Sequence, residues 1–404
     1  TAMNNRRFIR IQLLLLFILL LACCIWSCSG KQDVPDGTAS AGATSVLPDT
    51  GSETKAEPET ASETTPATET ETETETATET VTEPETSFNE GKVDYAIVDG
   101  TVIATPQDGY SLGLDITDRT DLIGICYTMW FNAIHGDGEG KLEGCLNVEE
   151  LIAQYGFSAK YGFGNEKEQH NHLHQFHYWS EPAQGYYRST DTDAIRNNMR
   201  LLYKAGVDFL ILDYTYAHAG YRLGSWEWIN YIGKPMNALL DTIMQMRAEG
   251  LGTPYVVMWM NDDSLFDAIY QSFYSVEKWT DCFVFWNDKP FIMRWNAGLD
   301  DIDTKYFTVR GMSGLHGAST AQWSYLQANN KRTVSYFGDD PEHVSVCVAA
   351  QLSYMSDPHS ANGRAGGVFW YSQWLTAFKI HPKIVSVTWW NEWTAQLNQS
   401  STAV

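Results

Sequence analysis

From residue 91 onward the sequence alternates between short apolar runs and longer segments of helical periodicity. Strands that alternate with helices form βα units with a parallel sheet, and continuous apolar strands fit a sheet that is covered on both faces. The pattern therefore predicts an α/β fold. The expected strands are 122–127, 207–213, 255–259, 344–351 and 384–390 with a hairpin over 283–295, and the expected helices are 194–205, 235–249, 265–276 and 370–380.

Several of the expected strands end in a polar or aromatic residue. A (β/α)₈ barrel builds its site at the carboxyl ends of its strands, so side chains at successive strand ends meet there. A doubly wound sheet is the alternative, but no glycine-rich nucleotide loop follows an early strand. The sequence therefore predicts a (β/α)₈ TIM-type barrel over residues 91–404. The strand-end residues are Trp130, Asp213, Asn261, Trp295, Gln351 and Glu392.

Residues 1–28 have the pattern of a bacterial lipoprotein signal peptide. Three arginines precede an apolar run from Ile11 to Trp26, and this run is shorter than the ~20 apolar residues of a membrane-spanning helix. Cys28 follows a small residue and precedes a polar tail, so we expect it to be lipidated after cleavage. Cys23 is the alternative lipidation site, and an uncleaved anchor helix is the alternative to cleavage.

Residues 29–90 are predicted to be a disordered, Thr/Glu-rich acidic linker. Between residues 31 and 90 there are 15 acidic residues and two lysines. Such a segment has almost nothing apolar to bury and its like charges repel, so it stays extended and holds a domain away from a surface. Together with the signal, this stalk predicts a protein on the extracellular face of the bacterial cell membrane, attached to the membrane through a lipid anchor.

Charge and aromatic content restrict the class of partner. The net charge is −23 and the pI is near 4.7, which disfavours nucleic acid because phosphate backbones bind basic surfaces. The 15 Trp and 21 Tyr residues offer flat apolar faces with a polar edge, which match the C–H faces of sugar rings. A carbohydrate partner is predicted, with aromatic filling of a core as the alternative, and no protein partner is required.

Segment 385–393 is the most specific candidate for chemistry. A hydrophobic strand there runs into Trp390-Asn391-Glu392, and another Trp follows. Glycosidic cleavage uses carboxyl groups beside a cationic transition state, which aromatic faces favour. Glu392 is therefore the first catalytic candidate. Asp213, which ends an apolar strand just before Tyr214, is the second, because an acid there destabilises the fold unless it is paired or functional. A purely structural carboxylate is the alternative for both.

A polar and aromatic segment from residue 177 to 189 is interpreted as a long loop that shapes the cleft. It contains Glu181, the third catalytic candidate. An ordinary surface loop is the alternative. The expected substrate-binding residues in this loop are His177, Tyr178, Trp179, Tyr187 and Arg188. Those expected elsewhere are Tyr127, Trp130, Tyr214, Trp259, Asn261, Trp295, Gln351, Trp390 and Asn391.

Four stretches, in this order, resemble the glycoside hydrolase family 71 and 99 superfamily, especially its uncharacterised bacterial members. They are His177-Tyr178-Trp179-Ser180-Glu181-Pro182, Gly185-Tyr186-Tyr187-Arg188-Ser189, the segment from Ala205 to Asp213, and Trp390-Asn391-Glu392-Trp393. The resemblance implies a (β/α)₈ barrel, no cofactor and activity on α-linked sugars. Family 99 enzymes are endo-acting α-mannosidases or mannanases, and family 71 enzymes act on α-1,3-glucan.

One position departs from this resemblance. Family 99 has a second Glu three positions after the one that Glu392 matches, and this chain has Ala395 there. The partner of Glu392 is expected to be Asp213 or Glu181, in that order. The predicted function is a glycoside hydrolase, endo-acting, that cleaves α-linked polysaccharide or oligosaccharide at the cell surface by carboxylate acid/base catalysis. A non-catalytic glycan-binding surface lipoprotein and a structural surface protein are the alternatives.

The strand that ends at Glu392 is interpreted, by analogy with the superfamily, as the seventh of the barrel. A closed barrel would then need one more βα unit of about 30 residues, whereas only 12 residues follow Glu392. We therefore expect a barrel truncated before its last βα unit, with unpaired edges on its first and seventh strands.

Neither a disulfide nor a metal site is expected. The cysteines after residue 91 form no C-x-x-C pair, and two of them lie inside apolar runs, so buried free thiols are predicted. A crowded set of histidines offers a zinc or copper site as the alternative, but no carboxylate or cysteine has a typical ligand spacing to it. The cysteines are Cys126, Cys145, Cys282 and Cys347, and the histidines are His170, His172, His174 and His177.

Overall fold

The computed structural model describes residues 91–131, 153–158, 162–164, 169–170, 182–185, 187–295, 305–313, 322–325, 334–348 and 364–392. All of these belong to the second of two units of the chain, Thr80–Val404. The signal peptide with Cys23 and Cys28, the acidic linker, and the residues after Glu392 lie outside the described residues. So do Cys145, His172, His174, His177, Tyr178, Trp179, Glu181 and Gln351.

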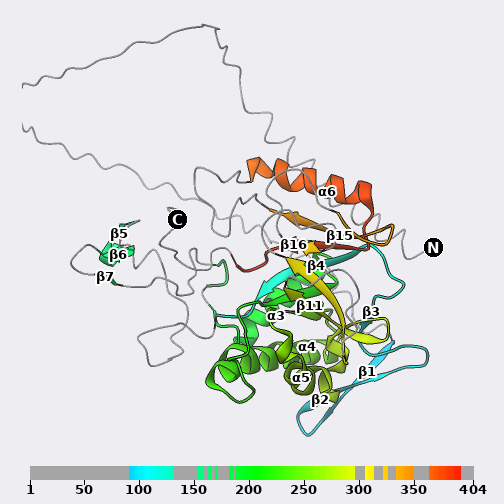
Figure 1. Ribbon diagram of the computed structural model, residues 1–404. Coiled ribbons are helices and arrows are strands. Elements are labelled where there is room, and N and C mark those ends of the chain that lie inside the picture. The colour runs from blue at the N-terminus through cyan, green and yellow to red at the C-terminus, as the bar shows by residue number, and fades with distance from the viewer. Residues whose placement is uncertain are drawn as a thin grey trace, which may run out of the picture. The chain divides into compact units, whose positions relative to one another are not determined.

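The elements of the domain are shown in Figure 1. Its strands are β1 (Val93–Val98), β2 (Thr101–Pro106), β3 (Leu114–Asp115), β4 (Leu122–Thr128), β5 (Phe157–Ser158), β6 (Gly162–Gly164), β7 (Gln169–His170), β8 (Phe209–Tyr214), β9 (Tyr255–Met260), β10 (Val284–Trp286), β11 (Lys289–Trp295), β12 (Thr308–Ser313), β13 (Trp323–Ser324), β14 (Ser335–Phe337), β15 (Asp340–Cys347) and β16 (Ile384–Thr388). Its α-helices are α3 (Thr192–Lys204), α4 (Lys234–Ala248), α5 (Phe266–Ile269) and α6 (Val368–Ile380), and its 3₁₀ and π segments are η1 (Trp228–Gly233), η2 (Asp263–Leu265), η3 (Tyr270–Tyr274), η4 (Glu277–Cys282) and η5 (Ala365–Gly367).

Eight of the described strands run parallel in one sheet, in the order β13-β12-β11-β9-β8-β4-β16-β15. Neighbours in this order are consecutive along the chain, except that the last strand, β16, pairs with the first, β4. A doubly wound sheet has a point where the strand order reverses, and this order has none. β13 and β15 contact each other, but the described residues show no backbone pairing between them and no closed barrel. The predicted α/β class is confirmed.

The interpretation of the strand before Glu392 as the seventh is wrong. In chain order β16 is the eighth of the parallel strands described, and it pairs with β4 from Ile384↔Leu122 to Val387↔Ile125, so the first strand is not an unpaired edge. β12 and β13 were not among the strands expected from the sequence, because neither is a continuous apolar run. β12 contains Arg310 and Gly311, and β13 is two residues long.

Local signals in the sequence account for most element boundaries. Asp191 caps α3, because its carboxylate accepts hydrogen bonds from the backbone N–H groups of Asp193 and Ala194. Pro235 lies in the first turn of α4, where its missing N–H is not needed. The β10–β11 hairpin turns at Asn287 and Asp288, both at positive φ. The helix expected over 265–276 is present, but its winding changes along η2, α5 and η3.

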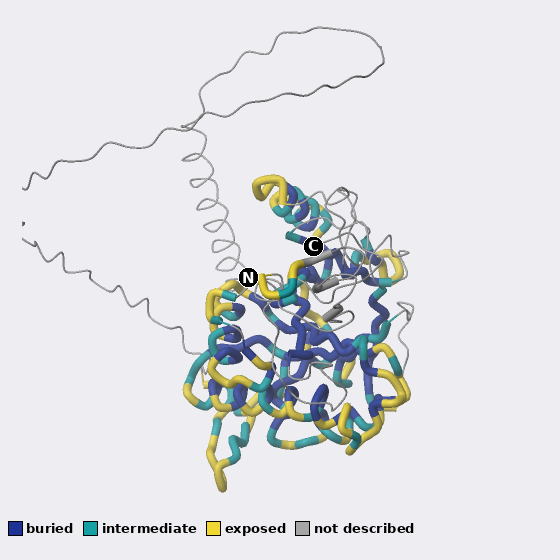
Figure 2. The backbone as a smooth tube through the Cα atoms, turned by 90° about the vertical axis from the view of Figure 1, so that its left-hand side faces the viewer, coloured by how far each residue is buried: buried dark blue, intermediate teal, exposed yellow. Residues whose placement is uncertain are grey.

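The parallel sheet is buried on both faces (dark blue in Figure 2). Successive residues of a strand face opposite sides, and the face that carries Tyr127, Leu212 and Met258 packs against α3, α4 and α5. We call this the helix face. The other, inner face carries a separate cluster, which includes Cys126 and Ile211 together with residues from both ends of the strand order, such as those of β13 and β15. The inner face is therefore curved around its own cluster.

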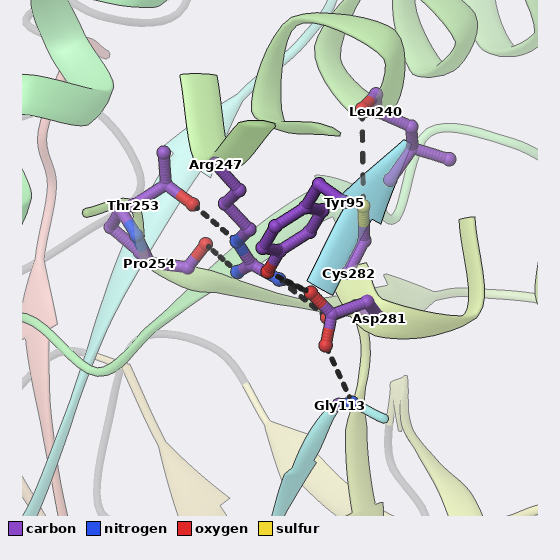
Figure 3. Close-up of polar contacts among 8 residues, drawn as sticks. All are labelled: Tyr95, Gly113, Leu240, Arg247, Thr253, Pro254, Asp281 and Cys282. Atoms are coloured by element: carbon purple, nitrogen blue, oxygen red, sulfur yellow. Dashed lines mark hydrogen bonds and ion pairs between the residues drawn. The ribbon is translucent and has the colours of Figure 1, made fainter. Parts of the chain in front are cut away.

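A buried ion pair attaches the N-terminal hairpin, β1–β2, to the domain (Figure 3). Arg247 of α4 is fully buried and donates to Oδ2 of Asp281 at 3.0 Å and to Oγ1 of Thr253 at 2.9 Å. Tyr95 of β1 donates its hydroxyl to the same carboxylate oxygen at 2.7 Å, and the backbone N–H of Gly113 donates to the other at 2.9 Å. Each hydrogen bond to Asp281 thus ties a different segment to one buried charge.

Cys126, Cys282 and Cys347 are buried and form no disulfide with a described residue, as predicted for these three. Burial raises the pKa of the Cys126 and Cys282 thiols, so both remain protonated near neutral pH. Within the described ranges, no helix is long and apolar enough to cross a membrane.

Candidate active site

Three polar or aromatic residues lie side by side at the carboxyl ends of β4, β8 and β9. Thr128 of β4 is the register partner of Asp213 of β8, and Asp213 is the partner of Trp259 of β9. Paired strands are about 4.8 Å apart, and partners on neighbouring strands face the same side. Asp213 is two positions after Ile211, so it faces the same, inner side of the sheet. All three side chains therefore belong to the inner face. Asp213 therefore lies between a hydroxyl group and an indole, and it is 5% exposed.

The chain beyond β16 continues along β4 and brings Glu392 to the same place. The backbone N–H of Trp390 donates to the carbonyl of Cys126 at 2.9 Å. The side chain of Asn391 then pairs with the backbone of β4 as a neighbouring strand would. Its Oδ1 accepts a hydrogen bond from the N–H of Thr128 at 2.8 Å, and its Nδ2 donates to the carbonyl of Thr128 at 3.0 Å. The hydroxyl of Thr128 donates to Oε2 of Glu392 at 3.3 Å.

The two carboxyl groups interact, and their proton affinities differ. Burial raises the pKa of Glu392 to about 8; the negative charge of Asp213 adds to this rise, and the hydrogen bond from Thr128 opposes it. Burial also raises the pKa of Asp213, to about 6, against the hydrogen bond that it accepts from the N–H of Thr215 at 2.8 Å. Between these two values Asp213 is ionised while Glu392 keeps its proton.

Aromatic rings adjoin this carboxyl pair on the inner face. The Trp259 ring stacks on Trp295 at 5.4 Å and on Trp389 at 6.4 Å, and it meets Tyr325 edge-on at 5.3 Å. We call these four residues the Trp259 stack. Trp259 is 1% exposed, and its Nε1 has no hydrogen-bond partner among the described residues.

The structure separates the two tryptophans that follow β16. Trp389 packs against the inner cluster, whereas Trp390, the predicted binding residue, packs against the helix-face cluster. Sequence reasoning missed Trp389, because choosing between adjacent tryptophans requires knowing which residue ends the strand. It also missed Tyr325, which follows the two-residue strand β13 and has no local signal of its own.

Two other predicted residues lie on the helix face, away from the carboxyl pair. Tyr127 is 2% exposed, and its hydroxyl accepts a hydrogen bond from Nδ2 of Asn198 on α3 at 2.9 Å. Tyr214 is fully buried and belongs to the same cluster. Each is next in sequence to an inner-face residue, Thr128 or Asp213, so the alternation of the strand directs it to the opposite side.

Tyr187 joins the site through hydrogen bonds. Its hydroxyl accepts from Nδ2 of Asn391 at 3.3 Å and from Nδ2 of Asn198 at 3.4 Å. The loop before α3 is thereby connected to the segment that carries Glu392. Asn198 was missed, although it was detectable as a polar residue on the apolar face of α3 between Ile195 and Met199.

The remaining predicted residues are more peripheral or lie outside the described part of the chain. Trp130 is buried against Tyr216, with ring centroids 5.6 Å apart, while Asn261 and Arg188 are exposed. Glu181, the other candidate partner of Glu392, is among the residues not described, as are His177, Tyr178, Trp179 and Gln351. The described residues contain no group of three or more His, Cys, Asp or Glu that could hold a metal ion.

Comparison with known proteins gives structural neighbours only. No protein-family model and no curated protein matches the sequence. The fold is similar to two structures of the family 99 endo-α-mannosidase from Bacteroides thetaiotaomicron, each at 15% identity and over 70% of this chain. The structure with bis-tris propane is covered over 87% of its length with a TM-score of 0.42, and the other over 88% with a TM-score of 0.44. At this level of similarity, the roles of residues must be inferred from the chain itself.

Proposed function

We propose that this protein is a glycoside hydrolase that cleaves α-linked polysaccharide or oligosaccharide by carboxylate acid/base catalysis. The observation that carries the proposal is the pair Asp213 and Glu392, two interacting carboxyl groups on either side of the end of β4, whose pKa values lie at about 6 and about 8. Glycoside hydrolysis requires one carboxylic acid and one carboxylate at the same bond. Environments that push two such pKa values apart assign the two roles.

In this proposal Glu392 is the general acid. It is protonated at neutral pH and donates its proton to the glycosidic oxygen as the bond to the leaving sugar breaks. Asp213 is ionised at the same pH and acts on the anomeric carbon, either directly as a nucleophile or through a water molecule as a general base. The charge of Asp213 also stabilises the positive charge that develops on the sugar ring.

The Trp259 stack gives the sugar an apolar surface beside the carboxyl pair. Aromatic faces pack against the C–H faces of sugar rings and favour nearby positive charge. Trp295 and Trp389 are partly exposed, so they are the members that a sugar can reach. Trp259 underlies both rings and fixes their orientation by stacking.

The finer features of the proposal are supported by the sequence and by the order of the strands. Eight parallel strands in cyclic order support a (β/α)₈ barrel. The α-linkage and endo action come from the resemblance to families 71 and 99. The signal and acidic linker support a lipoprotein anchored through Cys28 on the extracellular face of the cell membrane. No cofactor is invoked, since the two carboxyl groups supply both roles.

The test is hydrolysis of a panel of α-mannans and α-glucans, followed as new reducing ends. Glu392→Gln is expected to lower kcat by about 100-fold or more, the usual contribution of an acid–base group. In the wild-type protein, kcat/KM should follow a bell-shaped pH dependence with limbs near 6 and 8, because one carboxyl must be ionised and the other protonated.

Glu249→Gln is the matched control, because Glu249 is an exposed carboxylate paired with Arg196 at the surface. It should hydrolyse at the wild-type rate. Near-normal turnover by Glu392→Gln would remove Glu392 from the mechanism. A wild-type protein that binds a glycan of the panel and releases no reducing ends would instead be the glycan-binding lipoprotein, an alternative that Ala395 favours because the second family 99 carboxylate is missing there.

A further inference from the structure

Thr128 contacts the Asn391-Glu392 segment with all of its polar groups. Its backbone N–H donates to Asn391, its carbonyl accepts from Asn391, and its hydroxyl donates to Oε2 of Glu392. Thr128 is buried and lies more than 260 positions away from these residues in the sequence. One residue of β4 therefore fixes both the backbone course and the carboxyl group of the segment after β16.

Thr128 also lies between the two carboxyl groups. It is the register partner of Asp213 on β8, and it is bonded to Glu392, which follows β16 on the other side of β4. A neutral hydroxyl at this place can donate to one carboxyl without adding charge near the other.

We propose that Thr128 is a positioning residue that holds Glu392 against the end of β4 and directs its acidic proton to Oε1. This inference rests on the proposed function for its catalytic meaning. A hydroxyl that donates to Oε2 occupies that oxygen, so the proton of a neutral Glu392 is carried by Oε1, the oxygen not engaged by β4. The acid is thereby presented in one orientation, and its ionised form is stabilised by the same hydrogen bond.

The titratable groups around Glu392 are few among the described residues. Asp213 faces it from β8 and Cys126 from β4, with Cys347 next to Cys126 on the side of β15, and Tyr187 contacts the neighbouring Asn391. Asp213 raises the pKa of Glu392 and Thr128 lowers it. Burial raises the pKa of Cys126, so this thiol remains neutral over the pH range in which Glu392 titrates. Removal of the Thr128 hydroxyl is therefore expected to raise the pKa of Glu392.

The experiment compares Thr128→Val with Thr128→Ser in the full chain. Valine keeps the β-branched shape of a buried strand residue and loses the hydroxyl, whereas serine keeps the hydroxyl. The titration of Glu392 is followed by ¹³C NMR of protein labelled at the glutamate carboxyl carbons and is assigned by its loss in Glu392→Gln. Exposed glutamates are already ionised above pH 6, so the signal of Glu392 is distinct there.

In Thr128→Val, Glu392 should titrate about one pH unit higher than in the wild type. The upper limb of the pH–rate profile should move by the same amount, and kcat should fall about tenfold with KM changed by less than about twofold, because an interaction with the acid rather than with the ligand is lost. Thr128→Ser should restore all three. A purely structural residue would not move the titration.

An unchanged titration of Glu392 in folded Thr128→Val would overturn the inference. If the valine variant does not fold, Thr128→Ala provides the same comparison with serine. The proposed function fails separately: a wild-type protein with no hydrolytic activity on the panel would refute the hydrolase, while a raised titration in Thr128→Val would still establish that Thr128 positions Glu392.

Discussion

Glu392→Gln should become more stable than the wild type as the pH rises, because it removes a partly buried carboxyl group whose pKa is raised. Glutamine has nearly the shape of protonated glutamic acid and never ionises. In the wild type, a group with a raised pKa binds its proton more tightly in the folded state than in the unfolded state. The contribution of Glu392 to the free energy of unfolding is thus fully present below the unfolded-state pKa of 4.5, and it is lost as the pH rises toward the folded-state pKa of about 8.

The magnitude follows from those two pKa values. The change from 4.5 to about 8, at about 1.4 kcal/mol per pH unit, corresponds to nearly 5 kcal/mol at high pH. Most of this loss develops between pH 5 and 8. Because Glu392 is partly exposed and water lowers the cost of its charge, we expect the free energy of unfolding of Glu392→Gln, relative to the wild type, to increase by at most about 3 kcal/mol over that range.

The assay is urea unfolding at pH 5, 6, 7 and 8, followed by tryptophan fluorescence. The difference between variant and wild type should grow with pH, and any constant effect of the amide appears equally at every pH. Glu249→Gln is the control, since its exposed carboxylate pairs with Arg196 at the surface and its effect should change little with pH. A difference for Glu392→Gln that stays constant from pH 5 to 8 would show that Glu392 titrates normally and would remove the reason to regard it as an acid.

Three further outcomes are expected. Arg247→Met should lower the free energy of unfolding by about 3–5 kcal/mol, because it leaves the charge of Asp281 buried without its partner. Tyr95→Phe, which removes one hydrogen bond to the same carboxylate, should cost about 1–3 kcal/mol; equal thermal melts for both variants and the wild type would contradict the role of this pair. Metabolic labelling with a fatty-acid probe should tag the protein, and Cys28→Ala should abolish the tag; loss of the tag in Cys23→Ala alone would assign lipidation to Cys23.

Local patterns in the sequence determined much of the fold and the general place of the site. A cap at Asp191, a proline at the start of α4 and two turn residues at 287–288 act on their own neighbours, so they can be recognised without knowing the rest of the chain. Asp213 was recognisable as an acid at the end of an apolar strand, and Glu392 as an acid after another. Both inferences needed only the pattern of one segment.

Only the tertiary structure decided which residues meet these two carboxyl groups. Thr128 is an ordinary threonine in its own segment, and its importance comes from hydrogen bonds to residues more than 260 positions away. The choice of Trp389 over Trp390 depends on the position at which β16 ends, because a shift of one residue moves a side chain to the other face of a sheet. The pKa values are set by burial, which many distant segments create together. Short-range propensities determine the helices and strands. The site arises from contacts between these elements, and the sequence of one segment does not show which distant residues it will contact.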